Sequence, residues 1–472
     1  MLLQSVHGMT HESPRTTPKS TKGKRAASSS TTDTKKKAAL AEAMASNSEP
    51  KTAPVTIKTL LANIAKLKVK PPPQAIANSI WNFDDATIEQ DAASTRIIVH
   101  PRFPDLVKAF LAFKREHGSK YEKALYGTPE SFTWQHEVTR LVEKRPLVFM
   151  GGDDHTVLRD GRILRGNTNN PMSWNDNTET NEWDRNGTKD QDKNKFLTLE
   201  EYLSYDELML GSLIGVSSPS FFINDGNRYN QAKMGEPRSF EDRGIVIGLV
   251  GSRFERQDRM DSIFVLPPGN SPHQHPELTD IFSNFFGASR KPALPTLDFN
   301  VPMFRARIRI TVDLLLLESN ARAAATNKKA HTYVVGLGLG VWQANDSQAQ
   351  YYIETFTTAL SALALPHIGT LEFAWINDVP AQTQHDVIGE AGKQGIKVLF
   401  SKRNPAEKLK SDELLVLSYA WDGNAFPGNE YWQGSLAGSG DPAAACMSTI
   451  GELHNPLVNP FTKRIVVVGS EG

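Results

Sequence analysis

The pattern that most constrains the fold is a regular alternation of strand-like and helix-like segments between residue 334 and the C-terminus. Short runs rich in Val, Ile, Leu and Phe are typical of strands, and longer segments with helical spacing of apolar residues separate them. The predicted strands are 334–339, 370–376, 396–400, 414–419 and 465–468, and the predicted helices are 348–365, 385–394 and 442–454. Such alternation predicts an α/β fold with a largely parallel sheet, which binds ligands beyond the carboxyl ends of its strands.

The part of the chain before this alternation is predicted to be mainly helical. Thr198 and Glu201 have the spacing of a capping box, in which each side chain bonds the other residue's main chain at a helix start. Helices are expected at 56–69, 104–117, 130–143 and 200–215. The apolar run 244–251 is typical of a buried strand, and the polar segment 160–195 is expected to form a long surface loop.

Residues 1–55 differ in composition from everything that follows. They are rich in Ser, Thr, Lys and Ala and contain no aromatic residue. Such a segment cannot bury enough apolar surface to offset the entropy of ordering, so a disordered basic tail is predicted. The basic clusters at 22–25 and 35–37 are compatible with a nuclear address, but such clusters are also common in solvated tails.

Charge and cysteine content exclude several classes of protein. The chain has 53 basic and 53 acidic residues, and because the tail is basic the body is slightly acidic, which argues against nucleic acid as the main partner. One cysteine, Cys446, cannot form an internal disulfide and fits a reducing compartment. No apolar run has the length of a membrane span or of a secretory signal. We therefore expect an intracellular monomer, cytoplasmic or nuclear, with no membrane partner.

Two patterns suggest metal sites, and neither carries a metal prediction. Asp190, Asp192, Asn194 and Glu201 occupy calcium-ligand positions of an EF-hand loop. However, a lysine stands where that loop needs glycine, and no helix precedes it. The pair His273 and His275 lacks a nearby third ligand. No metal and no cofactor are predicted, and the GxSxG, HExxH, CxxC and Walker A patterns do not occur.

Two polar or glycine-rich segments are candidate ligand loops. Gly336, Gly338 and Gly340 follow a predicted strand and precede a helix, where glycine lets main-chain N–H groups approach a phosphate. Such a turn is also a common packing feature. The run from Ser217 to Arg228 contains hydroxyl, amide and guanidinium groups, and it suits either a simple turn or a polar ligand site.

The segment 419–433 carries the densest set of chemically active side chains. It leaves the end of a predicted strand and contains Asp422 and Glu430 among several aromatic residues. Aromatic rings stack on a base or ribose, and carboxylates supply the acid and base of glycosidic cleavage. Asp441 follows, although capping the next helix, with Pro442 at its first position, would explain both residues. The sequence leaves a functional loop and a packed connection as alternatives.

The chain resembles the MavL-like ADP-ribosyl hydrolases, the family of the Legionella effector MavL and its eukaryotic relatives. The resemblance rests on EYLSYDELMLGSLIGVSSPSFFINDGNR, GIVIGLVGSRFE, YVVGLGLGVWQ and SYAWDGNAFPGNEYW with GDPAAA. It implies a macrodomain-like three-layer α/β/α fold with N-terminal helical embellishments. It also implies removal of ADP-ribose from arginine, on ubiquitin in the case of MavL, by acidic residues.

The resemblance suggests how the residues are used. The implied catalytic carboxylates are Asp422, Glu430 and Asp441. The expected ligand-binding residues are Ser217, Ser218, Asn224, Asp225, Gly336, Gly338, Gly340, Trp421, Asn424, Asn429, Tyr431 and Trp432. The diphosphate is expected near the glycine turn and the serines. No Gln-Glu-Glu signature of poly(ADP-ribose) glycohydrolases occurs, which favours removal of a single ADP-ribose.

The predicted organisation is a tail at 1–55, a helical region at 56–150 and the macrodomain-like hydrolase domain at 151–472. Two other functions stay open at this point. A module that recognises ADP-ribosylated proteins without cleaving them would need no acidic cluster. A scaffold that engages partners through its tail and surface loops would not bind ADP-ribose at all.

Overall fold

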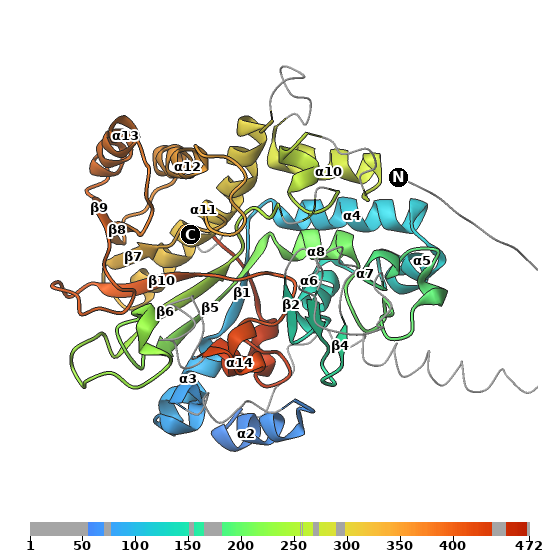
Figure 1. Ribbon diagram of the computed structural model, residues 1–472, viewed down its shortest axis with the longest axis horizontal. Coiled ribbons are helices and arrows are strands. Elements are labelled where there is room, and N and C mark those ends of the chain that lie inside the picture. Colours follow the sequence, from blue (N-terminus) through green and yellow to red (C-terminus); the bar gives the residue numbers. More distant parts are fainter. Residues whose placement is uncertain are drawn as a thin grey trace, which may run out of the picture. The chain divides into compact units, whose positions relative to one another are not determined.

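A large mixed sheet organises the computed structural model (Figure 1), which describes residues 55–69, 77–150, 155–164, 182–254, 256, 258–267, 273–288, 298–436 and 450–469. The sheet has eight strands in the order β11-β1-β5-β6-β10-β7-β8-β9. They are β1 Arg96–Val99, β5 Ile214–Phe221, β6 Arg243–Leu249, β7 Ala330–Val334, β8 Ile368–Ala374, β9 Lys397–Ser401, β10 Leu414–Ala420 and β11 Ile465–Val467. A three-stranded sheet contains β2 Val148–Met150, β3 His155–Val157 and β4 Ile163–Leu164.

The strands from β6 to β9 run parallel to one another. β10 pairs in parallel with β6 and β7, β7 with β8, and β8 with β9. This half of the sheet confirms the predicted α/β class and parallel sheet. β5, by contrast, is antiparallel to both β1 and β6, while β1 and β11 pair in parallel. Because β1 lies within 56–150, the predicted helical region contributes a strand to the central sheet.

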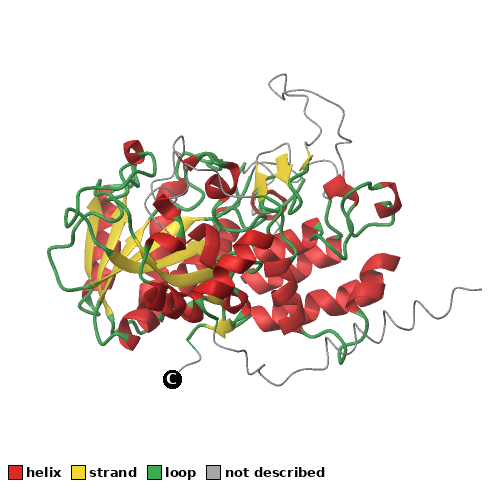
Figure 2. Ribbon diagram, turned by 90° about the horizontal axis from the view of Figure 1, so that it is seen from below, coloured by secondary structure: helices red, strands yellow, loops and turns green. Residues whose placement is uncertain are grey.

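Helices lie along both sides of the sheet, with α11, α12 and α13 on one side and α2, α3 and α14 on the other (Figure 1). A further group, formed by α4, α5, α6 and α8, lies beside the strands and appears as a block of helices in Figure 2. The bounds are α2 Ile57–Lys66, α3 Asp85–Ser94, α4 Phe103–His117, α5 Lys120–Tyr126, α6 Trp134–Glu143, α7 Glu182–Arg185, α8 Tyr205–Gly211, α9 Ser262–Val265, α10 Pro276–Phe286, α11 Val301–Ala325, α12 Gln348–Ala362, α13 Ala381–Gly392, α14 Asn429–Gln433 and α16 Ile450–Leu453. The described helices contain no stretch long and apolar enough to cross a membrane.

The long helix α11 ties the strands to the loops at their ends. Its Arg307 Nε lies 2.8 Å from Asp261 Oδ1, and both side chains are fully buried. Its Arg322 donates to Glu318 one turn earlier and to Ser217 Oγ of β5 at 3.1 Å. These buried polar contacts fix how the helix lies against the sheet, because a shift would leave charges unpaired.

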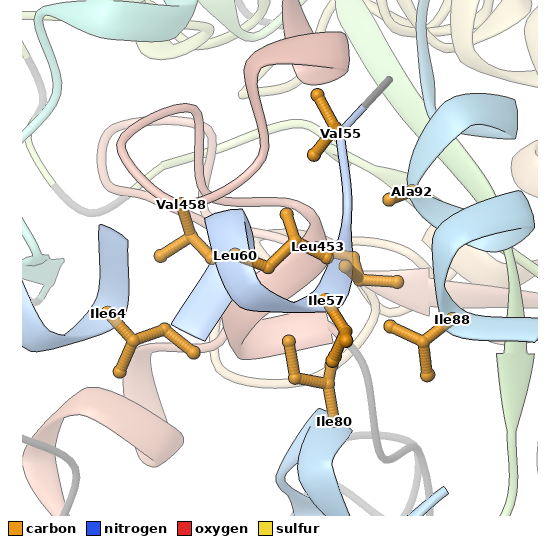
Figure 3. Packing of buried hydrophobic residues seen from close by; sticks show 9 residues of the cluster. All are labelled: Val55, Ile57, Leu60, Ile64, Ile80, Ile88, Ala92, Leu453 and Val458. Carbon is orange, nitrogen blue, oxygen red and sulfur yellow. The ribbon is translucent and has the colours of Figure 1, made fainter. Parts of the chain in front are cut away.

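The N-terminal helix α2 is held by a segment near the C-terminus. Ile57, Leu60 and Ile64 form its buried face and pack against Leu453 and Val458 (Figure 3). Their spacing places all three on one side of the helix. Full burial of each aliphatic side chain stabilises the fold by about 1.5–3 kcal/mol as an upper estimate. The two ends of the described chain therefore share one core cluster.

Two predictions for the segment 198–215 are wrong. The predicted capping box of Thr198 and Glu201 does not form, because Glu201 pairs with Arg159 at 2.9 Å. The capping box is instead Ser204 with Glu207, and it opens α8 five residues later than the predicted helix start at residue 200. The buried guanidinium of Arg140 holds Glu207 at 2.5 Å and favours this start.

Three further boundaries differ from the predictions. The strand predicted at 334–339 ends at Val334, where the glycine turn leaves the sheet. The polar run 217–228 begins inside strand β5, which ends at Phe221, and the predicted turn is confined to its second half, where Asn224 and Asp225 accept from main-chain N–H groups two residues later. The surface loop predicted at 160–195 contains α7, whose Glu182 and Trp183 are buried; residues 165–181 lie outside the described residues. The predicted tail and most of the predicted helix 442–454 also lie outside them.

Candidate active site

A cleft of about 270 Å³ opens at the carboxyl ends of the parallel strands β7 and β10. Two loops form most of its wall, one following each strand. The lining residues are Gly336, Gly338, Gly340, Val341, Trp342, Ala420, Trp421, Asp422, Gly428, Asn429 and Glu430. Parallel sheets bind ligands at this edge because the loops that follow neighbouring strands converge there.

The glycine loop serves packing at one position and leaves room at another. A Cβ added to Gly338, whose φ is +78°, would lie 2.9 Å from the carbonyl oxygen of Ser252. A Cβ on Gly251 would lie 2.5 Å from the main-chain nitrogen of Gly338. The loops after β6 and β7 thus touch backbone to backbone, which requires glycine. At Gly340 an added Cβ would meet nothing within 4 Å, so this glycine is not required by protein packing.

The loop after β10 brings the two described candidate carboxylates to the cleft. The Trp421 main-chain N–H donates to Leu249 at 3.0 Å, and its indole N–H donates to Ala425 at 3.0 Å. Asp422 Oδ2 accepts a hydrogen bond from the Asn429 amide. Gly423 and Gly428, with φ of +75° and +86°, turn the chain between Asp422 and Glu430. The loop is therefore a compact structure that fixes the Asp422 carboxylate.

Arg253, in the loop after β6, joins the two walls of the cleft. Its Nη1 donates to the main-chain carbonyl of Asp422 at 2.8 Å, and its guanidinium lies 4.6 Å from the ring centre of Trp342. Its own main-chain N–H donates to Asp261 Oδ2 at 2.9 Å. Sequence reasoning gave Arg253 no role. A signal was present, since it follows a buried strand and the carboxyl ends of parallel strands meet at one edge.

A buried arginine lies behind Trp421, one of the residues that line the cleft, and sequence reasoning also missed it. The Arg145 guanidinium lies 4.1 Å from the ring centre of Trp421, and the residue is 1% exposed. Burial lowers the pKa of Arg145 to about 9, with only Tyr419 opposing the shift. The side chain therefore remains a cation at neutral pH. No pattern near residue 145 indicates this role, because the contact joins distant parts of the chain.

The structure brings together seven of the predicted site residues as lining of the cleft. They are Gly336, Gly338, Gly340, Trp421, Asp422, Asn429 and Glu430. Asn424 lies buried within the same loop. Tyr431 and Trp432 are buried in a hydrophobic cluster, and the Tyr431 hydroxyl donates to Glu452 at 2.7 Å. Asp441 lies outside the described residues.

The remaining predicted residues are separated from the cleft. Ser217 and Ser218 are fully buried in β5, where they contact Arg322 and His454. Asn224 and Asp225 follow β5, whose end pairs with the amino end of β6. Because β5 is antiparallel to β6, these two residues lie at the edge of the sheet opposite the cleft.

No cluster of three or more His, Cys, Asp or Glu suited to a metal occurs among the described residues.

The amino-acid sequence matches one protein family and is similar to two Drosophila proteins. A family described as ADP-ribosylhydrolase MavL-like matches residues 77–271 and 284–467, which include both cleft loops. The ADP-ribosylarginine hydrolase CG3568 of Drosophila melanogaster is 34% identical over 410 residues, covering 79% of this chain and 77% of that protein. The ADP-ribosylarginine hydrolase CG2909 of the same organism is 31% identical over 445 residues, covering 84% of each.

Proposed function

The chain belongs to the MavL-like ADP-ribosylhydrolase family, and we propose that it removes ADP-ribose from arginine side chains with the carboxylates of its cleft. The observation that carries the proposal is the meeting of Asp422 and Glu430 with the glycine loop at one edge of the sheet. The names of both Drosophila relatives support the arginine linkage.

The reaction breaks the bond between the ribose anomeric carbon and a guanidinium nitrogen. Water supplies a hydroxyl to that carbon and a proton to the departing nitrogen, so the products are ADP-ribose and free arginine. The transition state resembles an oxocarbenium ion, as in other glycosidic cleavages. Negative charge near the anomeric carbon stabilises it, and a carboxylate can accept the proton of the attacking water.

Asp422 is the carboxylate that we assign to water activation and ribose orientation. The amide of Asn429 and the guanidinium of Arg253 hold its side chain and main chain. Such support favours catalysis, since it limits reorganisation during the reaction. Glu430 is assigned to protonation of the leaving nitrogen or recognition of the substrate guanidinium. Asp441 completes the acidic set through the family resemblance alone.

The ligand is proposed to place its diphosphate along residues 336–340, with Trp421 beside the ribose. Gly340 supports this placement because a Cβ added there would meet no protein atom within 4 Å, which leaves space for a ligand. The proposal includes the macrodomain-like form of the α/β fold, in agreement with helices on both sides of the sheet (Figure 1). It also includes release of a single ADP-ribose and a protein substrate, for which the resemblance suggests ubiquitin.

Asp422→Asn tests the proposal directly. Asparagine keeps the size of the side chain and an oxygen that can accept from Asn429, but it cannot act as a base. Release of ADP-ribose from an arginine-modified peptide should fall by about 10²–10⁴-fold. Chromatographic quantification of free ADP-ribose measures the rate, and calorimetric titration with ADP-ribose checks that the cleft remains intact. Arginine-modified ubiquitin is a second substrate for the same assay.

Asp412→Asn is the matched control, because Asp412 is an exposed carboxylate just before the opposite end of β10, where it pairs with Lys328. It should retain full turnover. Full turnover by Asp422→Asn would reject the catalytic assignment. Wild-type protein that binds ADP-ribose but releases none would instead be a recognition module, and no binding at millimolar ligand would reject the proposed function itself.

A further inference from the structure

Arg145 lies between α6 and β2 and reaches under the cleft from far along the chain. It is 1% exposed, and its guanidinium stacks 4.1 Å from the ring centre of Trp421, which lines the cleft. Gly211 makes room for it, since a Cβ there would lie 3.2 Å from Arg145 Nη2. The guanidinium is thus enclosed by protein and separated from the cleft by one aromatic side chain.

Arg145 differs from four other buried arginines of the described residues in lacking a carboxylate partner. Arg140 pairs with Glu207, Arg307 with Asp261, Arg322 with Glu318 and Arg259 with Asp184. Arg145 Nη2 reaches the carbonyl oxygen of Gly211 at 3.4 Å, and its Nε has no hydrogen-bond partner in the described part of the chain. No described carboxylate contributes to its charge state, and only the Tyr419 phenol opposes the effect of burial on its pKa.

An unpaired buried cation lowers the stability of a fold, and an apolar side chain of similar volume is often neutral or stabilising in its place. Packing therefore does not explain why an arginine stands here. A ligand that brings negative charge to the cleft would supply the missing partner. ADP-ribose, the ligand of the proposed function, carries two negative charges on its diphosphate, and a charge inside protein is weakly screened by salt.

We propose that Arg145 is a positioning residue whose buried charge strengthens binding of the ADP-ribose diphosphate in the cleft, acting through the Trp421 ring that it supports. The inference rests on the proposed function. It separates affinity from stability, because the same charge that attracts the ligand destabilises the ligand-free protein.

Arg145→Met and Arg145→Lys in the full chain test the inference. Methionine keeps an apolar body under Trp421 without the charge, and lysine keeps the charge without the flat stack. By calorimetry, Arg145→Met should bind ADP-ribose about tenfold more weakly, with a melting temperature at or above that of the wild type. Arg145→Lys should retain most of the affinity.

Arg243→Met is a matched control. Arg243 stacks 4.2 Å from the ring centre of Phe221 at the opposite edge of the sheet, and it pairs with Asp91 at 2.6 Å. Its replacement should lower the melting temperature and leave ADP-ribose affinity unchanged.

The outcomes separate this inference from the proposed function. Unchanged affinity in Arg145→Met overturns the inference alone. So does a lower melting temperature with an equal loss of affinity in the methionine and lysine variants, because that pattern indicates a structural role. A wild-type chain that does not bind ADP-ribose overturns the proposed function and this inference with it.

Discussion

The helical group beside the sheet and the cleft at the edge of the sheet differ in whether buried cations are paired with carboxylates. Between the helices, Lys114 Nζ lies 2.5 Å from both Glu122 and Asp206, and Arg140 Nε lies 2.5 Å from Glu207. Under the cleft, Arg145 has no described carboxylate, and Asn429 Oδ1 has no described hydrogen-bond donor. The difference indicates that the helical group pairs its buried cations with its own carboxylates, whereas the cleft leaves a buried cation for a ligand to satisfy.

Charge states follow the same division. Burial by itself would lower the pKa of Lys114, but the charges of Asp206 and Glu122 outweigh it and raise the pKa above its ordinary value. Burial lowers the pKa of Arg145 to about 9 because no described carboxylate offsets it. The paired charges therefore stabilise one another. The positive electrostatic potential of Arg145 is not offset by a carboxylate and can attract an anionic ligand.

The largest effect on stability is expected from breaking the Arg140 pair. Arg140→Met removes the cation that pairs with the buried Glu207 carboxylate and a donor to the carbonyl oxygens of Leu199 and Tyr202. We expect a loss of about 3–5 kcal/mol in the free energy of unfolding, measured by chemical denaturation, because an uncompensated charge stays buried.

The double variant Arg140→Met with Glu207→Gln should recover part of that loss, since glutamine removes the buried charge and still accepts from the Ser204 main chain. ADP-ribose affinity of the folded protein should not change in either variant. A loss below about 1 kcal/mol in Arg140→Met would break the comparison, because the paired region would then not depend on its pairs.

A smaller effect, limited to acid, is expected from His454. Its ring nitrogens lie 2.6 Å from Ser218 Oγ and 2.9 Å from the Tyr419 hydroxyl, and burial lowers its pKa to about 3. The unfolded chain binds a proton below about pH 6.5, whereas the folded chain does not until about pH 3. Stability from this group is therefore complete above pH 6.5 and falls by about 1.4 kcal/mol per pH unit below it.

His454→Gln should remove that slope while every other titrating group remains. The difference in unfolding free energy between wild type and variant should shrink by about 2 kcal/mol from pH 6.5 to pH 5. Parallel pH profiles of the two proteins would show that His454 titrates normally. The expected slope would add a third kind of buried titratable group to the comparison, one that is neither paired nor charged but neutral in the folded protein.

The smallest effect is expected from Glu137, an exception within the paired region. Its carboxyl is fully buried without a hydrogen-bond partner among the described residues, and burial raises its pKa well above the ordinary value. Because the pKa of Glu137 is higher in the folded chain than in the unfolded chain, the wild-type free energy of unfolding falls as the pH rises above the pKa of unfolded glutamate. Glu137→Met should therefore be within about 1 kcal/mol of wild type at pH 5 and about 1 kcal/mol more stable at pH 7.

Glu122→Met provides the contrast, because it removes a carboxylate that Lys114 uses. It should be destabilising at pH 7 in the same denaturation experiment. If Glu137→Met were as destabilising as Glu122→Met, Glu137 would belong to the paired network after all.

The sequence by itself determined the parallel half of the sheet and the neighbourhood of the glycine turn and Asp422. Strand-like runs separated by helical segments leave few arrangements, because right-handed crossovers align successive strands. The loops after β7 and β10 then meet at the same edge. Helix α11 left no such signal: it is buried on several sides, so its apolar residues do not mark a single face.

Tertiary structure alone decided which other residues share that edge. The antiparallel direction of β5 carries Asn224 and Asp225 to the opposite edge, although their text suggested a ligand loop. Tertiary contacts also bring Arg253 and Arg145 to the cleft from distant parts of the chain. Local periodicity records which face of an element is buried. It does not record strand direction or the partner of a buried charge, because those depend on contacts between segments far apart in sequence.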